Sequence, residues 1–187
     1  MTEERKVKGV AVIGLVELIR NVKDKPWEEH IPPEYMEIIN NSFIPSQWYP
    51  LEFSQKMVTA LIKIFVKDDE NIVEVLAKLL IDEIVKGPFK SFILVDDPCR
   101  AIKKIIELQD KNYNFSSAKI EQTGDKSITV TMDEMGETDD NLKYFTRYIS
   151  AQLKHLAQIN GAKNIDVREE TSTQGRNTRI DLFFKWD

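Results

Sequence analysis

The spacing of the apolar residues changes near residue 112 from the helical period of 3.6 to the strand period of 2. Of all the features of the sequence, this change constrains the fold most. The chain before it reads as helices interrupted by prolines. The chain after it reads as a β-hairpin, one long amphipathic helix and a second β-hairpin. We therefore predict an α+β fold in which an N-terminal helical layer, residues 1–111, precedes an antiparallel ββαββ sheet unit, residues 112–187. A chain of 187 residues can bury both parts in one core, so we predict a single domain, 1–187.

Helices are expected at residues 8–22, 34–40, 50–66, 72–87 and 98–110. Capping oxygens at residues 68–71 precede the fourth helix, Gly87-Pro88 ends it, and Asp97-Pro98 opens the fifth. A turn rich in apolar residues, 89–94, connects these two helices. The expected buried stripe of the fourth helix consists of Ile72, Val75, Leu76, Leu79, Leu80 and Ile84.

The segment before the third helix, Ser42–Pro50, is predicted to be a loop rich in aromatic residues. Pro50 suits a helix start, because its missing N–H would have no partner there anyway. Trp48 and Tyr49 can either pack the helix onto the core or form the wall of an apolar pocket, and we leave both open.

Alternation of apolar and polar residues predicts hairpins with one face exposed to water. The first alternation turns at Gly124-Asp125, and the second has a loop at Ser172–Asn177. Phe183 falls on the polar side of the last strand. The residues expected to face the core are Ala118, Ile120, Ile128, Val130 and Met132 in the first hairpin, Leu142, Phe145, Ile149, Leu153 and Leu156 in the helix, and Ile180, Leu182, Phe184 and Trp186 in the last strand.

Composition excludes several classes of function. The formal net charge of -5, with lysines interleaved among acids, argues against nucleic-acid binding, which needs clustered basic residues. The apolar stretch 10–16 is shorter than the roughly 20 residues of a membrane span, so no membrane span is expected. Cys99 is the single cysteine and cannot form an internal disulfide, which favours a cytoplasmic location.

No constellation of residues indicates catalysis. His30, Cys99 and His155 are far apart in the sequence, which argues against a metal site, and no nucleophile stands beside a base. We therefore predict that the protein is not an enzyme. His155 shares a helix face with Tyr144 and Tyr148, and this face can be exposed to solvent, bind a partner or line a pocket.

Three short motifs carry a resemblance to known proteins: Val7-Lys8-Gly9, Trp48-Tyr49-Pro50 and Gly161-Ala162-Lys163. Together they resemble a family of uncharacterised bacterial proteins abundant in myxobacteria. More distantly, helices followed by ββαββ are similar to the haem nitric-oxide-binding (H-NOX) sensors, the 4-vinyl-reductase ligand-binding domains and certain vesicle-tethering subunits. The resemblance implies an H-NOX-like fold that holds an apolar ligand, haem or an acyl chain between helices and sheet.

The same resemblance argues against haem in this chain. The helix expected to carry the proximal histidine is Pro98–Asp110, which contains Cys99 and no histidine. The propionate-binding pattern Tyr-x-Ser-x-Arg is compared with the segment that begins at Tyr113, where Phe115 and Ser117 replace its Ser and Arg. Because an axial ligand and a propionate clamp hold haem in such a site, we predict no cofactor.

The leading expectation is a non-catalytic sensory or ligand-binding protein for a small apolar molecule held between helices and sheet. The alternative is a protein-interaction module without a ligand, as a homodimer or with a signalling partner. The expected ligand contacts are Trp48, Tyr49, Phe53 and Cys99, and the expected interaction residues are Tyr144, Tyr148, His155 and Phe183.

Overall fold

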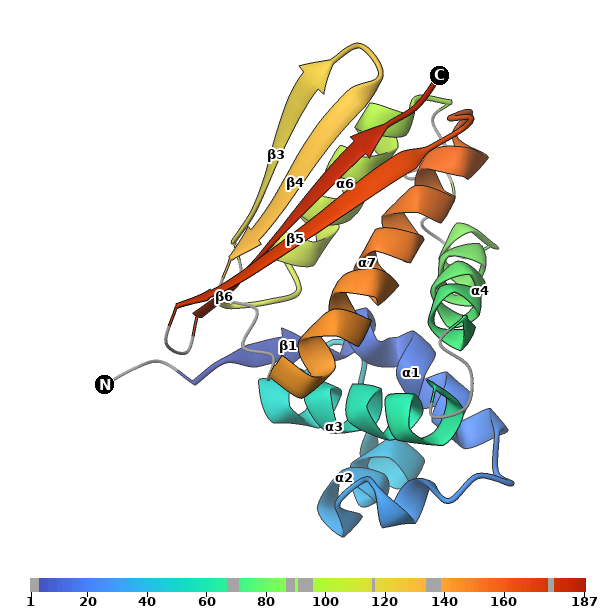
Figure 1. The fold of residues 1–187 in the computed structure, drawn as a ribbon. Coiled ribbons are helices and arrows are strands. Elements are labelled where there is room, and N and C mark those ends of the chain that lie inside the picture. The colour runs from blue at the N-terminus through green and yellow to red at the C-terminus, as the bar shows by residue number, and fades with distance from the viewer. Residues whose placement is uncertain are drawn as a thin grey trace. The chain divides into compact units, whose positions relative to one another are not determined.

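The fold is described from a computed structural model covering residues 4–66, 71–86, 90, 96–115, 117–133, 139–174 and 177–187 (Figure 1). The chain divides into two compact units. The N-terminal unit comprises Met1–Ile72 and Lys111–Phe115, and the sheet unit comprises Val73–Asp110 and Ser116–Asp187. The two last helices of the predicted helical layer are thus grouped with the sheet. The predicted features at residues 68–70, 87–89 and 91–94 lie outside the described residues.

The N-terminal unit is mainly helical. A short two-stranded sheet accompanies its helices, and a π-helical turn follows both α2 and α3. Its elements are β1 (Lys6–Lys8), α1 (Gly9–Asn21), a 3₁₀ turn (Trp27–Glu29), α2 (Pro33–Glu37), a π-helical turn (Ile38–Ser42), β2 (Trp48–Pro50), α3 (Leu51–Leu61) and a second π-helical turn (Ile62–Val66).

The expectation that Trp48-Tyr49-Pro50 belongs to a loop is wrong, because these residues form β2. They pair antiparallel with β1, where Val7 lies opposite Tyr49 and Lys8 opposite Trp48. Strands of three residues are too short to show alternation, and these two are far apart in sequence, so periodicity could not reveal them. The returning segment Lys111–Phe115 also lies beside β1, since the Lys8 N–H donates to the Asn112 carbonyl at 2.8 Å.

Gly9 permits a close backbone contact at the start of α1. Its N–H donates to the Gln47 carbonyl at 2.8 Å, and the Val10 N–H donates to the Pro45 carbonyl at 2.7 Å. A Cβ at residue 9 would lie 2.7 Å from the Ile44 carbonyl oxygen. The loop before β2 therefore satisfies two N–H groups that the helix start leaves unpaired.

The sheet unit contains one four-stranded antiparallel sheet in the order β3-β4-β6-β5. Side chains of α6 and α7 pack in one apolar cluster with the inner face of this sheet. Figure 1 shows the two helices alongside the sheet. The predicted ββαββ order is confirmed. The elements are α4 (Ile72–Lys86), α6 (Pro98–Asp110), β3 (Ser117–Gly124), β4 (Ser127–Asp133), α7 (Asp139–Ile159), β5 (Asp166–Gln174) and β6 (Asn177–Lys185).

The alternation predicted for the hairpins is confirmed in burial. Along β4, Ile128, Val130 and Met132 are buried while their neighbours are half-buried. Ile180, Leu182, Phe184 and Trp186 are likewise buried in the apolar cluster. The predicted loop Ser172–Asn177 is wrong at both ends, because strand pairing continues to Gln174 and resumes at Asn177. Its Ser and Thr residues lack an apolar alternation, so only their backbone pairing shows that they are strand.

Two helix ends have well-defined caps, and the cap of α6 is the predicted one. The Arg100 N–H donates to Asp97 Oδ1 at 3.0 Å, which confirms Asp97 as the cap of α6. After α7, the Ala162 N–H donates to the Ala157 carbonyl and the Gly161 N–H to the Gln158 carbonyl. Gly161 has a φ of 102°, so this helix ends in the Schellman motif that glycine favours.

The buried stripe expected for α4 is partly wrong. Val75 and Leu79 are 52% and 54% exposed, whereas Ala77 and Ile81 are buried. Apolar residues occupy most of the circumference of this helix, so its sequence does not show which side faces the protein.

Candidate functional site

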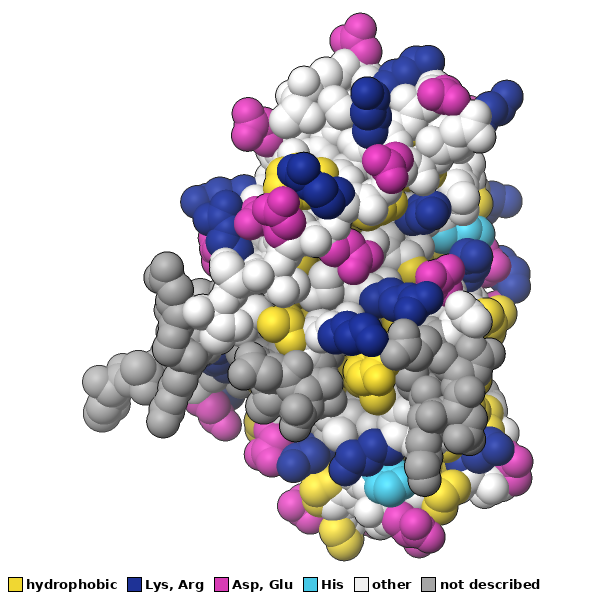
Figure 2. Space-filling model, viewed as in Figure 1, with side chains coloured by type: hydrophobic (Ala, Val, Ile, Leu, Met, Phe, Trp, Pro, Cys, Tyr) yellow, Lys and Arg dark blue, Asp and Glu magenta, His cyan; other side chains and the backbone are white. Residues whose placement is uncertain are grey.

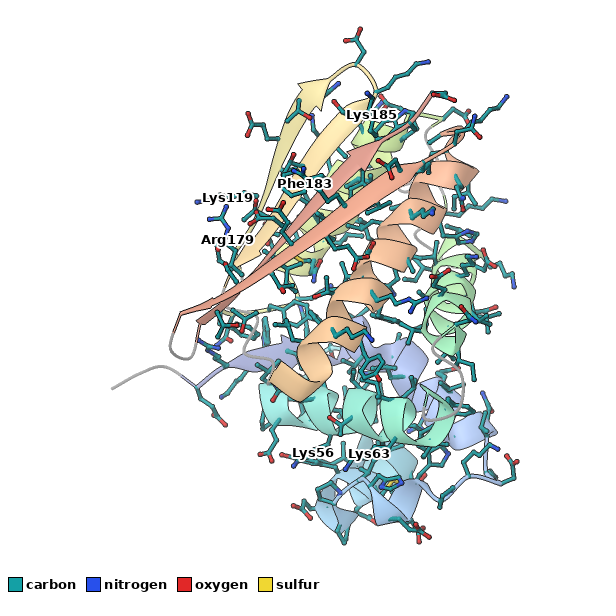
Figure 3. The ribbon with its side chains drawn as sticks, in the orientation of Figure 1. Lys56, Lys63, Lys119, Arg179, Phe183 and Lys185 are labelled. Carbon is teal, nitrogen blue, oxygen red and sulfur yellow. The ribbon has the colours of Figure 1, made fainter. Side chains whose placement is uncertain are left out.

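The outer face of the sheet carries one aromatic side chain, Phe183 of β6, among polar neighbours. Thr129 of β4 and Arg168 of β5 lie opposite it in the strand register. The Arg168 Cζ lies 4.3 Å from the centre of the Phe183 ring, so the guanidinium stacks over the ring. Figure 3 shows Phe183 on the same face as Lys119, Arg179 and Lys185.

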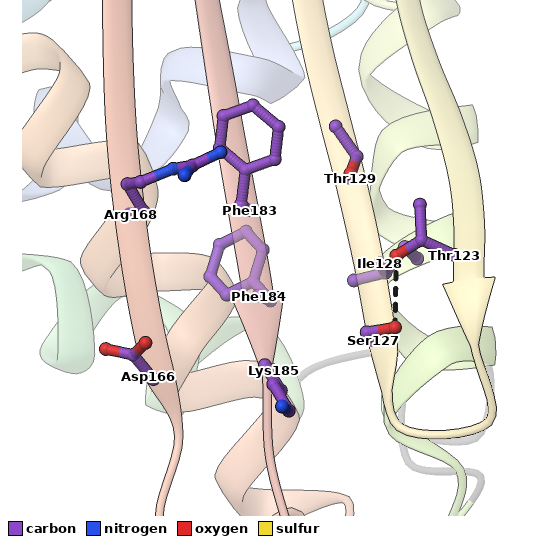
Figure 4. Close-up of a pocket in the computed structure, with 9 residues that line it drawn as sticks. All are labelled: Thr123, Ser127, Ile128, Thr129, Asp166, Arg168, Phe183, Phe184 and Lys185. Carbon is purple, nitrogen blue, oxygen red and sulfur yellow. Dashed lines mark hydrogen bonds between the residues drawn. The ribbon is translucent and has the colours of Figure 1, made fainter.

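A shallow groove of about 230 Å³ surrounds this pair (Figure 4). Its polar groups are hydroxyls, two cations and one carboxylate, and the Thr123 hydroxyl donates to Ser127 Oγ at 3.0 Å. Such a groove can offer hydrogen bonds and a stacking surface, but its groups show no nucleophile beside a base. The groove is lined by Thr123, Ser127, Ile128, Thr129, Asp166, Arg168, Phe183, Phe184 and Lys185.

A second polar network on this face centres on Asp181. The Arg179 guanidinium donates to both carboxylate oxygens at 2.8 and 3.1 Å, and the Thr131 hydroxyl donates to Oδ1 at 2.6 Å. The hydrogen bond from Arg179 and that from Thr131 hold the pKa of Asp181 below its ordinary value. Figure 2 shows basic and acidic side chains interspersed over this face, so no single sign of charge dominates it.

The predicted ligand contacts Tyr49 and Phe53 lie in an aromatic stack of the N-terminal unit. Their ring centres are 4.9 Å apart, and Phe43 stacks on the other side of Tyr49 at 5.5 Å. The Tyr49 hydroxyl accepts the Ile44 N–H at 2.8 Å and donates to the Ile44 carbonyl at 3.2 Å. Both side chains are buried, so they contribute to the packing of this unit. Trp48 differs, because it is 41% exposed with the Lys8 ammonium 5.8 Å from its ring centre.

Cys99, the fourth predicted contact, belongs to the sheet unit. Its thiol is buried in the cluster that α6 and α7 form with the sheet, together with Ile102 and Ile106. Burial, and then the nearby Asp97 carboxylate, raise the pKa of this thiol. Cys99 is therefore a neutral, apolar part of the core at neutral pH.

The Tyr144, Tyr148 and His155 face of α7 makes specific contacts. His155 Nε2 lies 2.7 Å from Asp82 Oδ1 of α4, and the Gln152 amide donates to the Tyr148 hydroxyl at 2.8 Å. Tyr148 also packs against the main apolar cluster, whereas Tyr144 is half-buried. This face therefore meets α4 at His155, a contact that periodicity could not predict.

The chemistry of the described residues is limited in two respects. No group of three or more His, Cys, Asp or Glu side chains among them could hold a metal ion. None of the helices in the described part of the chain is long and apolar enough to cross a membrane.

Comparison with known proteins establishes the fold. No family model and no curated protein matches the sequence, so the myxobacterial-type family stays a prediction. Solved H-NOX structures do match. A Cs H-NOX variant with an unnatural amino acid has a TM-score of 0.69 at 12% identity, with 96% of each chain covered. An oxygen-binding H-NOX domain related to soluble guanylate cyclases, in its oxygen complex, scores 0.64 at 10% identity over 96% of this chain and 95% of that one.

A third structure, a mutant Fe(II) unliganded H-NOX protein from K. algicida, scores 0.60 at 11% identity with 96% of each chain covered. In all three comparisons the structural match covers nearly the full length of both chains. The chain therefore has an H-NOX-like α+β fold, as the sequence predicted. At such low identity the match establishes the fold only. The ligand has to be inferred from the residues of this chain.

Sequence reasoning missed two features of the sheet unit. The sequence places Phe183 on the polar face. Which residue stacks on it, Arg168, is decided by the register between β5 and β6. Thr146 of α7 is 2% exposed, and its hydroxyl has no hydrogen-bond partner among the described residues. Its position beside the apolar stripe of the helix is the sequence signal that could have marked it.

Proposed function

We propose that this protein is a non-catalytic sensory or ligand-binding protein that holds a small apolar molecule between helices and sheet, without haem. The observation that carries the proposal is the H-NOX-like fold shared over 96% of both chains with Cs H-NOX. The absence of a membrane-spanning helix among the described residues and the single, buried cysteine are consistent with a cytoplasmic location.

The residues of α6 do not fit haem. The resemblance places the axial ligand on this helix, which has no histidine and carries Cys99 near its start. A raised pKa keeps the Cys99 thiol protonated at neutral pH, whereas iron ligation needs the thiolate. His155 lies on α7 and is engaged by Asp82. We therefore propose that the molecule bound is an apolar one without iron.

The proposed ligand contacts remain Trp48, Tyr49, Phe53 and Cys99. An exposed indole such as that of Trp48 can cover an apolar molecule at low cost in conformational entropy. A protonated thiol at Cys99 behaves as a small apolar group, which suits the same class of ligand. These properties support an apolar ligand over an anionic one.

Native mass spectrometry of the purified protein, combined with thermal unfolding, tests this proposal. We expect a retained apolar adduct, or an increased Tm with one of a panel of uncharged lipids such as long-chain alcohols and diacylglycerols, and no Soret absorption after incubation with hemin. Trp48→Ala should weaken the effect, whereas Leu79→Ala, which truncates a similarly exposed apolar side chain, should leave it unchanged. No adduct and no shift with the whole panel would refute ligand binding, and a stoichiometric Soret band would refute the exclusion of haem.

A second function is favoured by the outer face of the sheet. The Phe183 ring stacked under Arg168 forms a compact aromatic and cationic contact of the kind enriched in interfaces. We propose as the alternative that this face binds a second copy of the chain or a signalling partner. Sedimentation velocity distinguishes the two forms of the alternative: self-association that Phe183→Ala abolishes supports the homodimer, and a monomer at all concentrations excludes it.

A further inference from the structure

The outer face of the sheet carries a charge pattern that is complementary to itself. Each row of the strand register crosses the sheet from β3 through β4 and β6 to β5. In the row of Phe183, Glu121 stands at the β3 end and Arg168 at the β5 end. In the neighbouring row, Lys119 stands at the β3 end and Glu170 at the β5 end. The two ends of each of these rows therefore carry opposite charges.

These four charged side chains are exposed on the outer face. Ala118 and Ile120 of β3 and Val167 of β5 pack against the inner apolar cluster, so the residues that alternate with them point outward. Figure 3 shows Lys119 on the same face as Phe183. Within one chain the two ends of a row are three strand spacings apart, about 14 Å, so their charges do not pair with each other.

A two-fold axis parallel to the strands places the β3 end of each row opposite the β5 end of the same row in a second copy. We propose that a second copy of this chain binds the outer face in this way, as a symmetric dimer whose sheets pack face to face. Glu121 then faces the partner's Arg168, and Lys119 faces the partner's Glu170. Symmetry makes each contact twice. The proposal rests on the second function proposed above and commits that face to one occupant.

The middle strands fit the same arrangement. Thr129 and Phe183 occupy neighbouring positions of one row, on either side of the axis, so each Phe183 ring faces the partner's Thr129. The groove of about 230 Å³ borders Phe183 on the side of Thr129 and Ser127, where it offers room for the partner's ring (Figure 4). In the next row, Ser127 faces the partner's Lys185.

A two-fold axis perpendicular to the strands fits less well. Placed between the two charged rows, it would bring Lys185 against the partner's Arg179, and the Phe183 ring against the partner's Asp181. The axis parallel to the strands instead brings Asp133 of β4 against the partner's Arg179 of β6. Opposite charges then meet in three rows, so the charge pattern selects the parallel axis.

The area of the face suits a reversible dimer. Four strands about 4.8 Å apart, with seven residues in β4 at about 3.4 Å each, give a face of about 19 by 24 Å. Two such faces bury about 900 Å² in total, which is the size of transient rather than permanent interfaces. We therefore expect a Kd in the micromolar range that rises with salt concentration, because the charge pairs are exposed.

Sedimentation velocity of the full chain, over a concentration series that extends into the millimolar range, tests the dimer. Glu121→Arg and Arg168→Glu each turn two attractions into repulsions, so each should raise the Kd about ten- to one-hundred-fold. An equimolar mixture of the two variants should associate again, because opposite charges then meet at both contacts of the mixed dimer. Within one chain these residues are too far apart for such a rescue, so it reports a contact between copies.

Glu107→Arg is the matched control, because it reverses the charge of an exposed residue on α6. It should leave the Kd unchanged. Lys119→Glu and Glu170→Lys repeat the mixing test in the neighbouring row if Arg168→Glu perturbs the stacking on Phe183.

The outcomes separate this arrangement from the proposed functions. An unsubstituted chain that stays monomeric would refute the dimer and leave a signalling partner as the occupant of the face. Association that Phe183→Ala abolishes, but that the mixed variants do not restore, would refute the two-fold arrangement and retain the face. Association that none of these variants weakens would refute both. Ligand binding is measured separately, so it can fail or hold in every case.

Discussion

Phe183 and Phe184 are adjacent residues on opposite faces of β6, and their truncation provides a sharp test of the fold. Phe184 is 2% exposed and packs in the cluster formed by the sheet, α6 and α7. Phe184→Ala removes a buried ring and leaves a cavity, so we expect it to lower the free energy of unfolding by about 3 to 5 kcal/mol.

Phe183→Ala is the matched control. Its ring is half-buried on the outer face and touches the Arg168 guanidinium, with a Cζ-to-centroid distance of 4.3 Å. Loss of this stacking and of part of the apolar contact should cost about 1 kcal/mol. The two variants have the same chemistry and nearly the same position, so their difference of roughly 2 to 4 kcal/mol measures which face is buried.

Urea unfolding followed by circular dichroism and by tryptophan fluorescence measures both values. Coincident transitions from the two probes are needed, because the chain has two compact units and the free energies assume two-state unfolding. Equal costs for the two substitutions, or a larger cost for Phe183→Ala, would refute the assignment of the inner face.

Three further predictions concern single residues. Thr146→Val should raise the free energy of unfolding by about 1 kcal/mol, since valine has no hydroxyl to leave unpaired, and a destabilised variant in urea unfolding would contradict this. Gly161→Ala should cost about 1 to 2 kcal/mol because of the positive φ there, and calorimetry should show the lower Tm. The pKa of Asp181 is lowered in the folded state, so its contact with Arg179 stabilises above the ordinary carboxyl range and is lost as pH falls through the folded pKa. Asp181→Asn should therefore flatten the loss of stability in urea below about pH 4, and an unchanged pH profile would contradict it.

The sheet and the helix that covers it could be predicted because their signals are local and repeated. The alternation through Ile180, Leu182 and Phe184 needs only the period of a strand, and the structure buries all three. The strand Trp48–Pro50 could not be predicted, because three residues show no period and their partners in β1 are distant in sequence. Similarly, the contact between His155 and Asp82 depends on how two helices dock.

In the candidate sites too, the sequence shows the type of each residue but not which residue it contacts. Phe183 could be placed on the polar face from alternation, whereas its contact with Arg168 required the strand register. Tyr49 and Phe53 are recognisable as aromatic residues before and within a helix, but the sequence does not show that Tyr49 stacks on both Phe43 and Phe53. Residue chemistry therefore selects candidates, and packing decides what each one contacts.

The packing of the sheet unit has a direct consequence for ligand binding. Side chains of α6, α7 and the inner sheet face pack against one another in one cluster that includes Cys99. A core packed from the chain's own apolar side chains does not need a cofactor to fold, so the purified chain should fold before any ligand is added. Under that condition the stability that a ligand adds grows with the logarithm of one plus the ratio of its free concentration to its Kd. The Tm of the sheet unit should therefore rise continuously with ligand concentration, and folding that requires the ligand from the outset would contradict this description of the core.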